Sequence, residues 1–212
     1  MGFLKRNVMD FKAELLSWEK TRELSEIIGK KIKAKGYKVD VIVAIARGGL
    51  VPAMNISDVL GVPDILSIGV SHWGITAKKD ERARIKFPLQ ADLSAKNVLI
   101  VDDLTDTGDS IKMVLEHIAA CNPKNVKTAT LLHKSVSTFE PDFYAEKVEG
   151  WKWIIFPWNL VEDLRNLIQR VAEKEGFEAN ALKDIKKLQK SLKKNFNLDI
   201  DEKIIKRVLE FI

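Results

Sequence analysis

Short apolar runs alternate with amphipathic stretches along the first two thirds of the chain. The runs of strand length lie at 39–46, 64–70, 97–101, 126–133 and near 143–148. Apolar residues recur at helical spacing in three further stretches, at 18–36, 51–60 and 110–120. Uniformly apolar strands that alternate with helices are typical of a parallel sheet covered on both faces. The pattern therefore predicts an α/β fold, with a mainly parallel sheet flanked by helices.

The pattern changes after Pro157, where the spacing of apolar residues becomes helical throughout. Three helices are predicted, at 159–174, 178–194 and 201–211. Asp201 is a good N-cap for the last of them, because its carboxylate can accept a backbone N–H. We expect residues 1–157 to form the α/β domain and residues 158–212 to form a C-terminal three-helix bundle.

Composition narrows the class of protein and its compartment. The chain has 212 residues, of which 46% are hydrophobic and 31% are charged. Its single cysteine, Cys121, excludes an internal disulfide and suits a reducing compartment. Residues 1–16 carry charges where a signal peptide has an apolar core, and no apolar run approaches the ~18 residues of a membrane helix. We therefore expect a cytoplasmic protein that does not bind a membrane.

The formal net charge of +5 is dispersed along the chain. No long block of one sign is present, so the sequence does not favour a basic arm that binds nucleic acid. A dispersed positive surplus suits polyphosphate ligands as well as it suits nucleic acid.

Two adjacent aspartates follow a predicted strand in VLIVDDLTDTGDS, residues 98–110. In open α/β sheets, ligands bind beyond the carboxyl ends of the strands, where Asp102 and Asp103 fall. The small polar residues behind them lead into a helix, whose N-terminal N–H groups favour phosphate. Carboxylates repel phosphate, but they suit ribose hydroxyls and Mg²⁺. The stretch therefore predicts a site for a ribose 5-phosphate.

A simpler interpretation is a strand-end turn whose acids cap the next helix. One acid is enough for a cap, whereas this stretch has four acids within eight residues. A second motif, AIARGGLVPA at 44–53, places Arg47, Gly48 and Gly49 directly after another strand. An ordinary strand-to-helix turn explains that motif when it is taken alone. The two motifs together favour a ligand site.

VLIVDDLTDTGDS resembles the phosphoribosyl-pyrophosphate (PRPP) signature of the type I phosphoribosyltransferases, and AIARGGLVPA resembles the pyrophosphate loop of their 6-oxopurine branch. The resemblance, which covers roughly residues 18–160, implies that Asp102 and Asp103 hold the ribose hydroxyls and Mg²⁺. It also implies that the pyrophosphate loop contacts pyrophosphate through Arg47, Gly48 and Gly49, after a cis peptide between Ala46 and Arg47. The other PRPP-binding residues are implied to be Leu104, Thr105, Asp106, Thr107, Gly108, Asp109 and Ser110. Among them, Thr105 replaces the aliphatic residue that is usual in the family.

The same resemblance implies where the base binds. Lys134, in HKS at 133–135, matches the lysine that recognises the exocyclic oxygen of a purine. Trp153 and Ile154, in GWKWIIFPWN at 150–159, match the residues that stack on the base and lie beside it. An apolar aromatic platform suits a purine face, although tryptophans in this segment also suit packing of the helical bundle. Ile155 stands where some relatives have an acid, so the resemblance supports no second metal contact there.

The implied reaction is purine salvage: the 5-phosphoribosyl group passes from PRPP to N9 of a purine, and pyrophosphate leaves with the nucleoside monophosphate as product. Asp106 is implied to be the catalytic acid–base group near N7 of the base. The polar segment 71–84, with Ser71, Lys78, Lys79 and Arg82, is expected to close over the reaction, unless it is only solvated surface. The resemblance also implies a homodimer.

Two features of the chain point to different purines. Lys134 favours an oxygen acceptor at C6, as in hypoxanthine, guanine or xanthine, because an ammonium opposes the amino group of adenine. The whole chain, with its helical C-terminus, is similar to archaeal adenine phosphoribosyltransferases, and on that basis we expect adenine, giving AMP. A regulator that senses PRPP and binds nucleic acid is the alternative of another class. Intact Asp106, Lys134 and Trp153 favour catalysis over regulation.

Overall fold

The computed structural model describes residues 11–71, 83–177 and 184–211. The chain forms two units, each described by itself. The first, the α/β unit, is Trp18–Gly150, and the second, the helical unit, joins the segment before Trp18 to the segment from Trp151 onward. This division differs from the boundary expected between residues 157 and 158, because the residues next to both ends of the α/β unit group with the helices.

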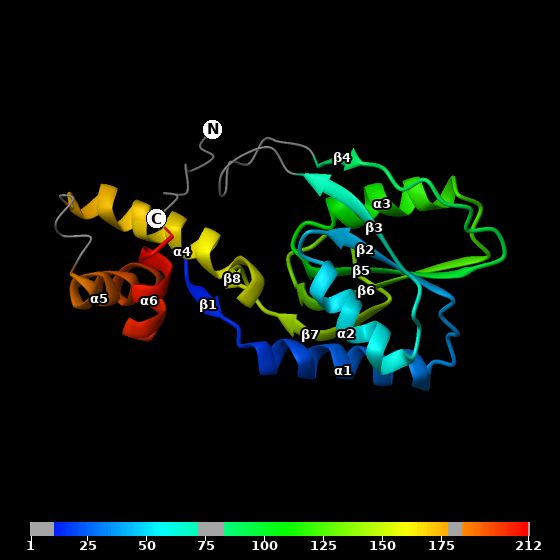
Figure 1. The fold of residues 1–212 in the computed structure, drawn as a ribbon, viewed down its shortest axis with the longest axis horizontal. Coiled ribbons are helices and arrows are strands. Elements are labelled where there is room, and N and C mark those ends of the chain that lie inside the picture. The colour runs from blue at the N-terminus through cyan, green and yellow to red at the C-terminus, as the bar shows by residue number, and fades with distance from the viewer. Residues whose placement is uncertain (1–10, 72–82, 178–183, 212) are drawn as a thin grey trace. The chain divides into compact units, whose positions relative to one another are not determined.

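The α/β unit contains a sheet of six strands within the described residues, in the order β4-β3-β2-β5-β6-β7. Its elements are α1 (Trp18–Ala34), β2 (Val41–Ala46), α2 (Leu50–Leu60), β3 (Ile65–Ser71), β4 (Arg84–Phe87), β5 (Asn97–Thr105), α3 (Asp109–Ala119), β6 (Asn125–Lys134) and β7 (Phe143–Val148). Neighbouring strands are parallel except for β3 and β4, which are antiparallel. Helices α1 and α2 lie on one face of the sheet and α3 on the other (Figure 1). The predicted fold class is confirmed.

Both faces of the central strands are buried, as their uniformly apolar sequence requires. On the side of α3, Val43 and Ile45 of β2 share a core with Ile100 of β5 and with Ile111 and Val114 of the helix. The intervening residues of β2 are buried as well. Every predicted strand of this unit is therefore present, and β4, a short strand with three charged or exposed positions, is the one that the pattern missed.

The strand register brings the motifs to one edge of the sheet. Ala44 of β2 pairs with Val101 of β5, and Thr105 of β5 pairs with His133 of β6. Because these strands are parallel, the segments that follow them emerge at the same edge. The aspartate motif, the Arg-Gly-Gly turn and the end of β6 therefore meet there.

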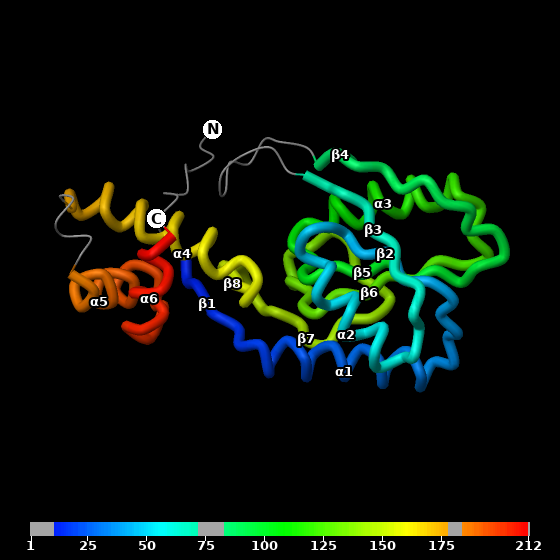
Figure 2. Tube along the Cα trace, viewed as in Figure 1, coloured from blue at the N-terminus to red at the C-terminus, as the bar shows by residue number. Residues whose placement is uncertain are grey.

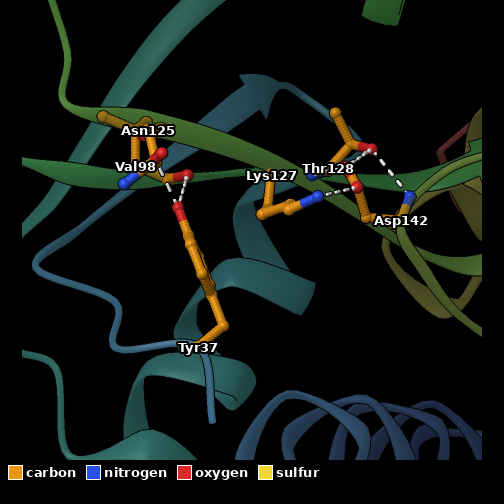
Figure 3. A network of polar contacts seen from close by, with 6 residues as sticks. All are labelled: Tyr37, Val98, Asn125, Lys127, Thr128 and Asp142. Carbon is orange, nitrogen blue, oxygen red and sulfur yellow. Dashed lines mark hydrogen bonds and ion pairs between the residues drawn. The ribbon is translucent and has the colours of Figure 1, made fainter. Parts of the chain in front are cut away.

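A different polar network joins neighbouring segments at the opposite end of the sheet, where the parallel strands begin (Figure 3). Asp142 accepts hydrogen bonds from the backbone N and the hydroxyl of Thr128, both at 2.9 Å, and from Lys127 Nζ at 2.6 Å. The hydroxyl of Tyr37 donates to the carbonyl of Val98 at 2.9 Å. Burial, helped by Asp142, raises the pKa of Tyr37 to about 12. These contacts are structural, since they lie at the end of the strands away from the motifs.

The helical unit is built from both ends of the described chain, as the path in Figure 2 shows. Its elements are β1 (Ala13–Leu15), β8 (Trp153–Ile155), the 3₁₀ turn η1 (Pro157–Asn159), α4 (Leu160–Glu175), α5 (Ile185–Phe196) and α6 (Glu202–Leu209). β1 and β8 form a parallel pair with Ala13 opposite Trp153. This pairing assigns the residues before Trp18 to the helical unit, and three-residue strands are too short to be recognised from sequence pattern.

The three helices of this unit agree with the prediction, and Asp201 is the N-cap that the sequence predicts. Asp184 and Asp201 are the N-caps of α5 and α6, accepting backbone N–H groups at 3.0 and 2.7 Å. Their apolar stripes share one core, formed by Leu160, Leu164, Leu167, Ile168, Val171, Leu188, Leu192, Phe196, Ile205 and Val208 among others. The predicted start of the middle helix, at 178–183, lies outside the described residues. Among the described helices, none has both the length and the apolar character needed to cross a membrane.

Candidate active site

Strand β5 continues through the aspartate pair, which corrects the expectation that it ends at residue 101. Asp102 pairs with Thr130 of β6, and the ladder continues to the pair Thr105–His133. The long neighbour β6 supplies backbone partners for these polar positions, so hydrogen bonding rather than side-chain polarity decides where the strand ends. The two carboxylates are therefore held on a strand.

The aspartate pair concentrates negative charge at a partly buried place. Asp103 N donates to Asp102 Oδ1 at 2.9 Å, and both side chains are half-buried. Burial, together with the charge of Asp103, raises the pKa of the Asp102 carboxyl well above its ordinary value. Keeping both carboxylates ionised here costs free energy, and a cation or a hydroxyl donor bound to the pair would lower that cost. The chemistry of the pair thus fits both ribose hydroxyls and Mg²⁺.

The loop behind the pair opens helix α3. Gly108, the N-cap of α3, has φ +93°, and a side chain there would run into Phe139. The Thr107 hydroxyl donates to Asp109 Oδ2 at 2.9 Å, and Asp109 and Ser110 are the first two residues of the helix. The positive end of the helix dipole and the small residues together make a cradle for an anion.

A hydroxyl-rich segment after β6 supports this loop through hydrogen bonds. The sequence analysis did not predict this contact. Thr138 donates to the carbonyl of Thr107 from its backbone N at 3.2 Å and from its hydroxyl at 3.1 Å. Lys112 Nζ donates in turn to the hydroxyl of Thr138 at 2.8 Å. The stretch Ser-Val-Ser-Thr at 135–138 was the available signal, since hydroxyls clustered after a strand suit such contacts.

The Arg-Gly-Gly turn lies directly against the aspartate pair. The peptide between Ala46 and Arg47 is cis, as the resemblance implied. A Cβ on Gly48 would come within 2.6 Å of Asp103 Cγ, and one on Gly49 within 2.8 Å of the carbonyl oxygen of Ile45. A side chain at Gly48 would therefore collide with the carboxylate of Asp103, and one at Gly49 would collide with backbone atoms of the strands. Arg47 itself is exposed.

Lys134 ends β6 as a buried cation facing an acid of the loop. Its side chain is 1% exposed, and its Nζ lies 3.2 Å from Asp106 Oδ1, whose side chain is 44% exposed. Burial lowers the pKa of the Lys134 ammonium, and Asp106 partly offsets this effect. The structure thus brings together the residue expected to recognise the base and the residue expected to handle its proton.

Thr105 takes a structural position at the end of β5. Its side chain is buried, and its hydroxyl pairs with that of Thr130 at 3.1 Å. This hydrogen bond satisfies the polar group that replaces an aliphatic residue. Leu104, the neighbour of Thr105, is half-buried on the same strand.

The remaining expected base-binding residues belong to the helical unit. Trp153 and Ile154 lie on β8, where Trp153 is half-buried and Ile154 is 6% exposed. The indole N–H of Trp153 donates to Asp163 Oδ1 at 3.1 Å. Trp158 stacks on Phe156, with ring centroids 4.9 Å apart, which agrees with a packing role for that tryptophan.

Two further expectations concern segments and ions. Of the segment expected to close over the site, residues 72–82 lie outside the described residues, and Ser71 ends β3. Within the described part of the chain, no group of three or more His, Cys, Asp or Glu side chains is arranged to hold a metal ion. Mg²⁺ is often held by one or two carboxylates together with substrate oxygens, and the pair Asp102–Asp103 fits that mode.

Comparison with known proteins identifies the family. A family model described as the phosphoribosyl transferase domain matches residues 13–163. The xanthine-guanine phosphoribosyltransferases of Idiomarina loihiensis and Gluconobacter oxydans are 32% and 31% identical to the chain, each over 68% of this chain and over 86% and 83% of their own length. A solved purine phosphoribosyltransferase from Pyrococcus horikoshii is 35% identical, with a TM-score of 0.61 over 69% of this chain and 93% of that chain. The chain therefore belongs to the phosphoribosyltransferase family and has the type I fold that its two motifs predicted.

Proposed function

We propose that the protein transfers the 5-phosphoribosyl group of PRPP to N9 of a 6-oxopurine, in purine salvage, with release of pyrophosphate. The observation that carries the choice of base is the buried Lys134 ammonium, 3.2 Å from Asp106 at the edge where the PRPP motifs meet. A buried ammonium has only donors to offer, so it suits the oxygen at C6 of hypoxanthine, guanine or xanthine. The exocyclic amino group of adenine is a donor as well, and the two would leave each other unsatisfied.

The comparisons favour the 6-oxopurine alternative over the adenine that the whole-chain resemblance led us to expect. The relatives quoted above at 31–32% identity are named as xanthine-guanine enzymes. Most of the helical extension, on which the adenine expectation depended, lies beyond the residues that the family model matches. The chemistry of Lys134 and the names of these relatives both favour a 6-oxopurine. We therefore no longer expect adenine as the base or AMP as the product.

In this proposal each part of the site holds one part of PRPP. Asp102 and Asp103 accept hydrogen bonds from the ribose hydroxyls, and the loop at 106–110 holds the 5-phosphate at the start of α3. Arg47, with the close-packed Gly48 and Gly49, holds pyrophosphate. Trp153 and Ile154 provide the apolar face for the purine, and the homodimer implied by the resemblance stays a prediction.

The reaction forms the bond between C1′ of ribose and N9 and breaks the bond between C1′ and the pyrophosphate oxygen. Positive charge develops on the ribose ring in between, and in this proposal the aspartate pair stabilises it. The purine loses the proton of its imidazole ring, which in this proposal passes to Asp106 while Lys134 donates a hydrogen bond to O6. When bound, Mg²⁺ neutralises charge on the pyrophosphate, and Asp102 and Asp103 are the residues that would hold it. A correctly placed acid–base group contributes about 10²–10⁴-fold in rate.

The test is a panel of bases. The protein is incubated with PRPP, Mg²⁺ and hypoxanthine, guanine, xanthine or adenine in separate reactions, and the nucleotides are separated by chromatography. We expect a nucleoside monophosphate from at least one 6-oxopurine, with kcat/KM about 10²-fold or more above that for adenine. Product from adenine alone would overturn the choice of base. A reaction without PRPP controls for contaminating nucleotide.

A further inference from the structure

We propose that Thr138 is a positioning residue for the 5-phosphate of PRPP: it holds the peptide between Thr107 and Gly108 in one orientation. This peptide belongs to the loop at 106–110, which we call the phosphate loop. The inference rests on the proposed function, in which the phosphate loop holds the 5-phosphate. Thr138 itself lies outside both sequence motifs, in the segment between β6 and β7 of the α/β unit.

Thr138 holds the carbonyl oxygen of Thr107 with two hydrogen bonds. Its backbone N donates to that oxygen at 3.2 Å, and its hydroxyl donates to the same oxygen at 3.1 Å. A carbonyl oxygen has two lone pairs, so this single residue satisfies it completely. Lys112 Nζ donates to the Thr138 hydroxyl at 2.8 Å. Because an ammonium only donates, the hydroxyl accepts from Lys112 and directs its own proton to Thr107.

Fixing this carbonyl also fixes the direction of the Gly108 N–H. The two groups belong to one planar trans peptide, in which they point in opposite directions. Gly108 has φ +93°, and a glycine adopts φ of either sign, so its own backbone preference does not stop the peptide from turning over. A turned peptide would place the carbonyl oxygen where the N–H now points. A phosphate bound at the start of α3 would then face an acceptor in place of a donor.

The other contacts of the phosphate loop do not replace this one. The Thr107 hydroxyl donates to Asp109 Oδ2 at 2.9 Å and accepts from Asp109 N at 3.3 Å, so these bonds hold only the side chain of Thr107. Lys112 N donates to the carbonyl of Gly108 at 3.0 Å, which fixes the next peptide along the chain. The orientation of the peptide between Thr107 and Gly108 therefore depends on Thr138.

The segment that carries Thr138 is itself held in place. Ser137 N donates to the carbonyl of Lys134 at 3.0 Å, and the Ser137 hydroxyl accepts from Phe139 N at 3.2 Å. The neighbouring residue Phe139 packs so closely on the phosphate loop that a Cβ on Gly108 would collide with it. Thr138 therefore meets the loop from a direction that the end of β6 sets.

Removing the Thr138 hydroxyl should weaken phosphate binding, because a share of the molecules then carries the turned peptide. In Thr138→Val, which keeps the shape of the side chain and the backbone N–H, we expect the KM for PRPP to rise about three- to tenfold. We expect kcat and the KM for the purine to stay within about twofold of the unchanged protein. Thr138→Ser keeps the hydroxyl and should restore most of the affinity for PRPP.

Direct binding and a matched variant separate positioning from general destabilisation. Isothermal titration calorimetry with ribose 5-phosphate should show the same loss in Thr138→Val, without any turnover. Thr128→Val is the control, because the Thr128 hydroxyl donates to Asp142 Oδ2 at 2.9 Å at the opposite end of the sheet. Thr128 is buried whereas Thr138 is exposed, so the control should lower thermal stability more and leave ribose 5-phosphate binding unchanged. Equal weakening by the two variants, unchanged binding in Thr138→Val, or no rescue by Thr138→Ser would overturn the proposal.

Isotope labels on one peptide distinguish this inference from the proposed function. The dipeptide Thr-Gly occurs once in the chain, at 107–108. Threonine labelled with ¹³C at its carbonyl and glycine labelled with ¹⁵N, supplied in cell-free synthesis, therefore give one bonded ¹³C–¹⁵N pair. Its resonance should shift in Thr138→Val but not in Thr128→Val, and a resonance that Thr138→Val leaves unchanged would sink the inference even in an active enzyme.

The remaining outcomes assign a failure to one proposal or to both. If the resonance shifts and ribose 5-phosphate binds less well in Thr138→Val, but the unchanged protein converts no 6-oxopurine, the proposed function fails and the role of Thr138 stands. If the unchanged protein binds no ribose 5-phosphate, both proposals fail.

Discussion

Lys134 is the residue on which the choice of substrate depends. The side chain of Lys134 is 1% exposed. Burying its ammonium costs free energy unless carboxylates or other hydrogen-bond acceptors lie against it. Asp106 faces it at 3.2 Å and is itself half-exposed. In the proposed function, the C6 oxygen of the purine accepts a further hydrogen bond from this ammonium.

Replacing this lysine should remove activity without unfolding the protein. In Lys134→Met, which keeps the length and apolar character of the side chain, we expect kcat/KM for the 6-oxopurine to fall about 10²-fold. The free energy of unfolding should hold or rise, because a buried charge is replaced by an apolar group. Steady-state kinetics and urea unfolding measure the two effects.

The matched control lies on the same strand. Lys127 pairs with Asp142 at 2.6 Å at the amino end of β6. Lys127→Met should leave kcat/KM within about twofold of the unchanged protein. If both lysine variants lose activity alike, the loss reflects the strand and not recognition of the base.

The single residues of the site could be predicted, but their contacts could not. Asp102, Asp103 and Lys134 stand out by type and by their place at strand ends. The approach of Gly48 to Asp103 and the pairing of Lys134 with Asp106 join distant parts of the chain, and no local pattern reports such contacts. The hydrogen bond between Trp153 and Asp163 gave no signal either, because an acid in the first turn of a helix is ordinary.

At the scale of elements, the turn between β2 and α2 is built to touch β5. Gly48 faces the carboxylate of Asp103, whereas Gly49 faces backbone atoms of β2 and β5. The first contact involves a functional group that can turn aside, and the second involves strands that cannot. Adjacent glycines should therefore respond differently to the same added methyl group.

Alanine at each glycine tests this difference. Gly48→Ala should displace Asp103 and lower kcat/KM for PRPP about tenfold or more, with little change in stability. Gly49→Ala should cost about 1–3 kcal/mol in the free energy of unfolding, because the backbone must shift. Kinetics and urea unfolding of both variants give the comparison. Equal stability of the two variants would contradict the geometry.

The end of α4 supplies a pH-dependent contact within the helical unit. Glu175 accepts from Ser191 Oγ at 2.7 Å and from Asn195 Nδ2 at 2.8 Å on α5. These hydrogen bonds, the Ser191 one first, lower the pKa of Glu175. A lowered folded-state pKa adds stability that is complete above the ordinary glutamate pKa and is lost as pH falls through the lowered value.

Glu175→Gln should show this dependence. At about pH 7 we expect the variant to lose about 1 kcal/mol in the free energy of unfolding, and we expect the difference to shrink as the pH falls through the lowered pKa of Glu175, where the unchanged protein takes up the proton. Urea unfolding at several pH values measures it. Glu173→Gln, an exposed change on the same helix, is the control and should stay within about 0.5 kcal/mol. A difference that is constant with pH would contradict the assigned contact.

Elements were predictable where their own residues decide them. The spacing of apolar residues and caps such as Asp201 predict the helices, and uniformly apolar runs predict the central strands. The last four residues of β5 did not, because their strand conformation comes from the ladder to β6. β1 and β8 depend in the same way on each other, across most of the chain.

The whole molecule divides its tasks between two units. The α/β unit carries both PRPP motifs and Lys134, and the helical unit carries β8 and the three C-terminal helices. The family match covers the first unit and the beginning of the second, as far as residue 163. The fold class and family of the chain were therefore predictable from its motifs, whereas its sequence pattern predicted the helices of the extension but no role for them.

The pairing of β1 with β8 has a consequence for the order in which the protein is made. Ala13 leaves the ribosome early, but its partner Trp153 is synthesised only after the entire α/β unit. The α/β unit, being continuous, can acquire its structure during translation, whereas the helical unit must wait until β8 and the helices after it have been synthesised. Until then the newborn polypeptide carries β1 without its strand partner.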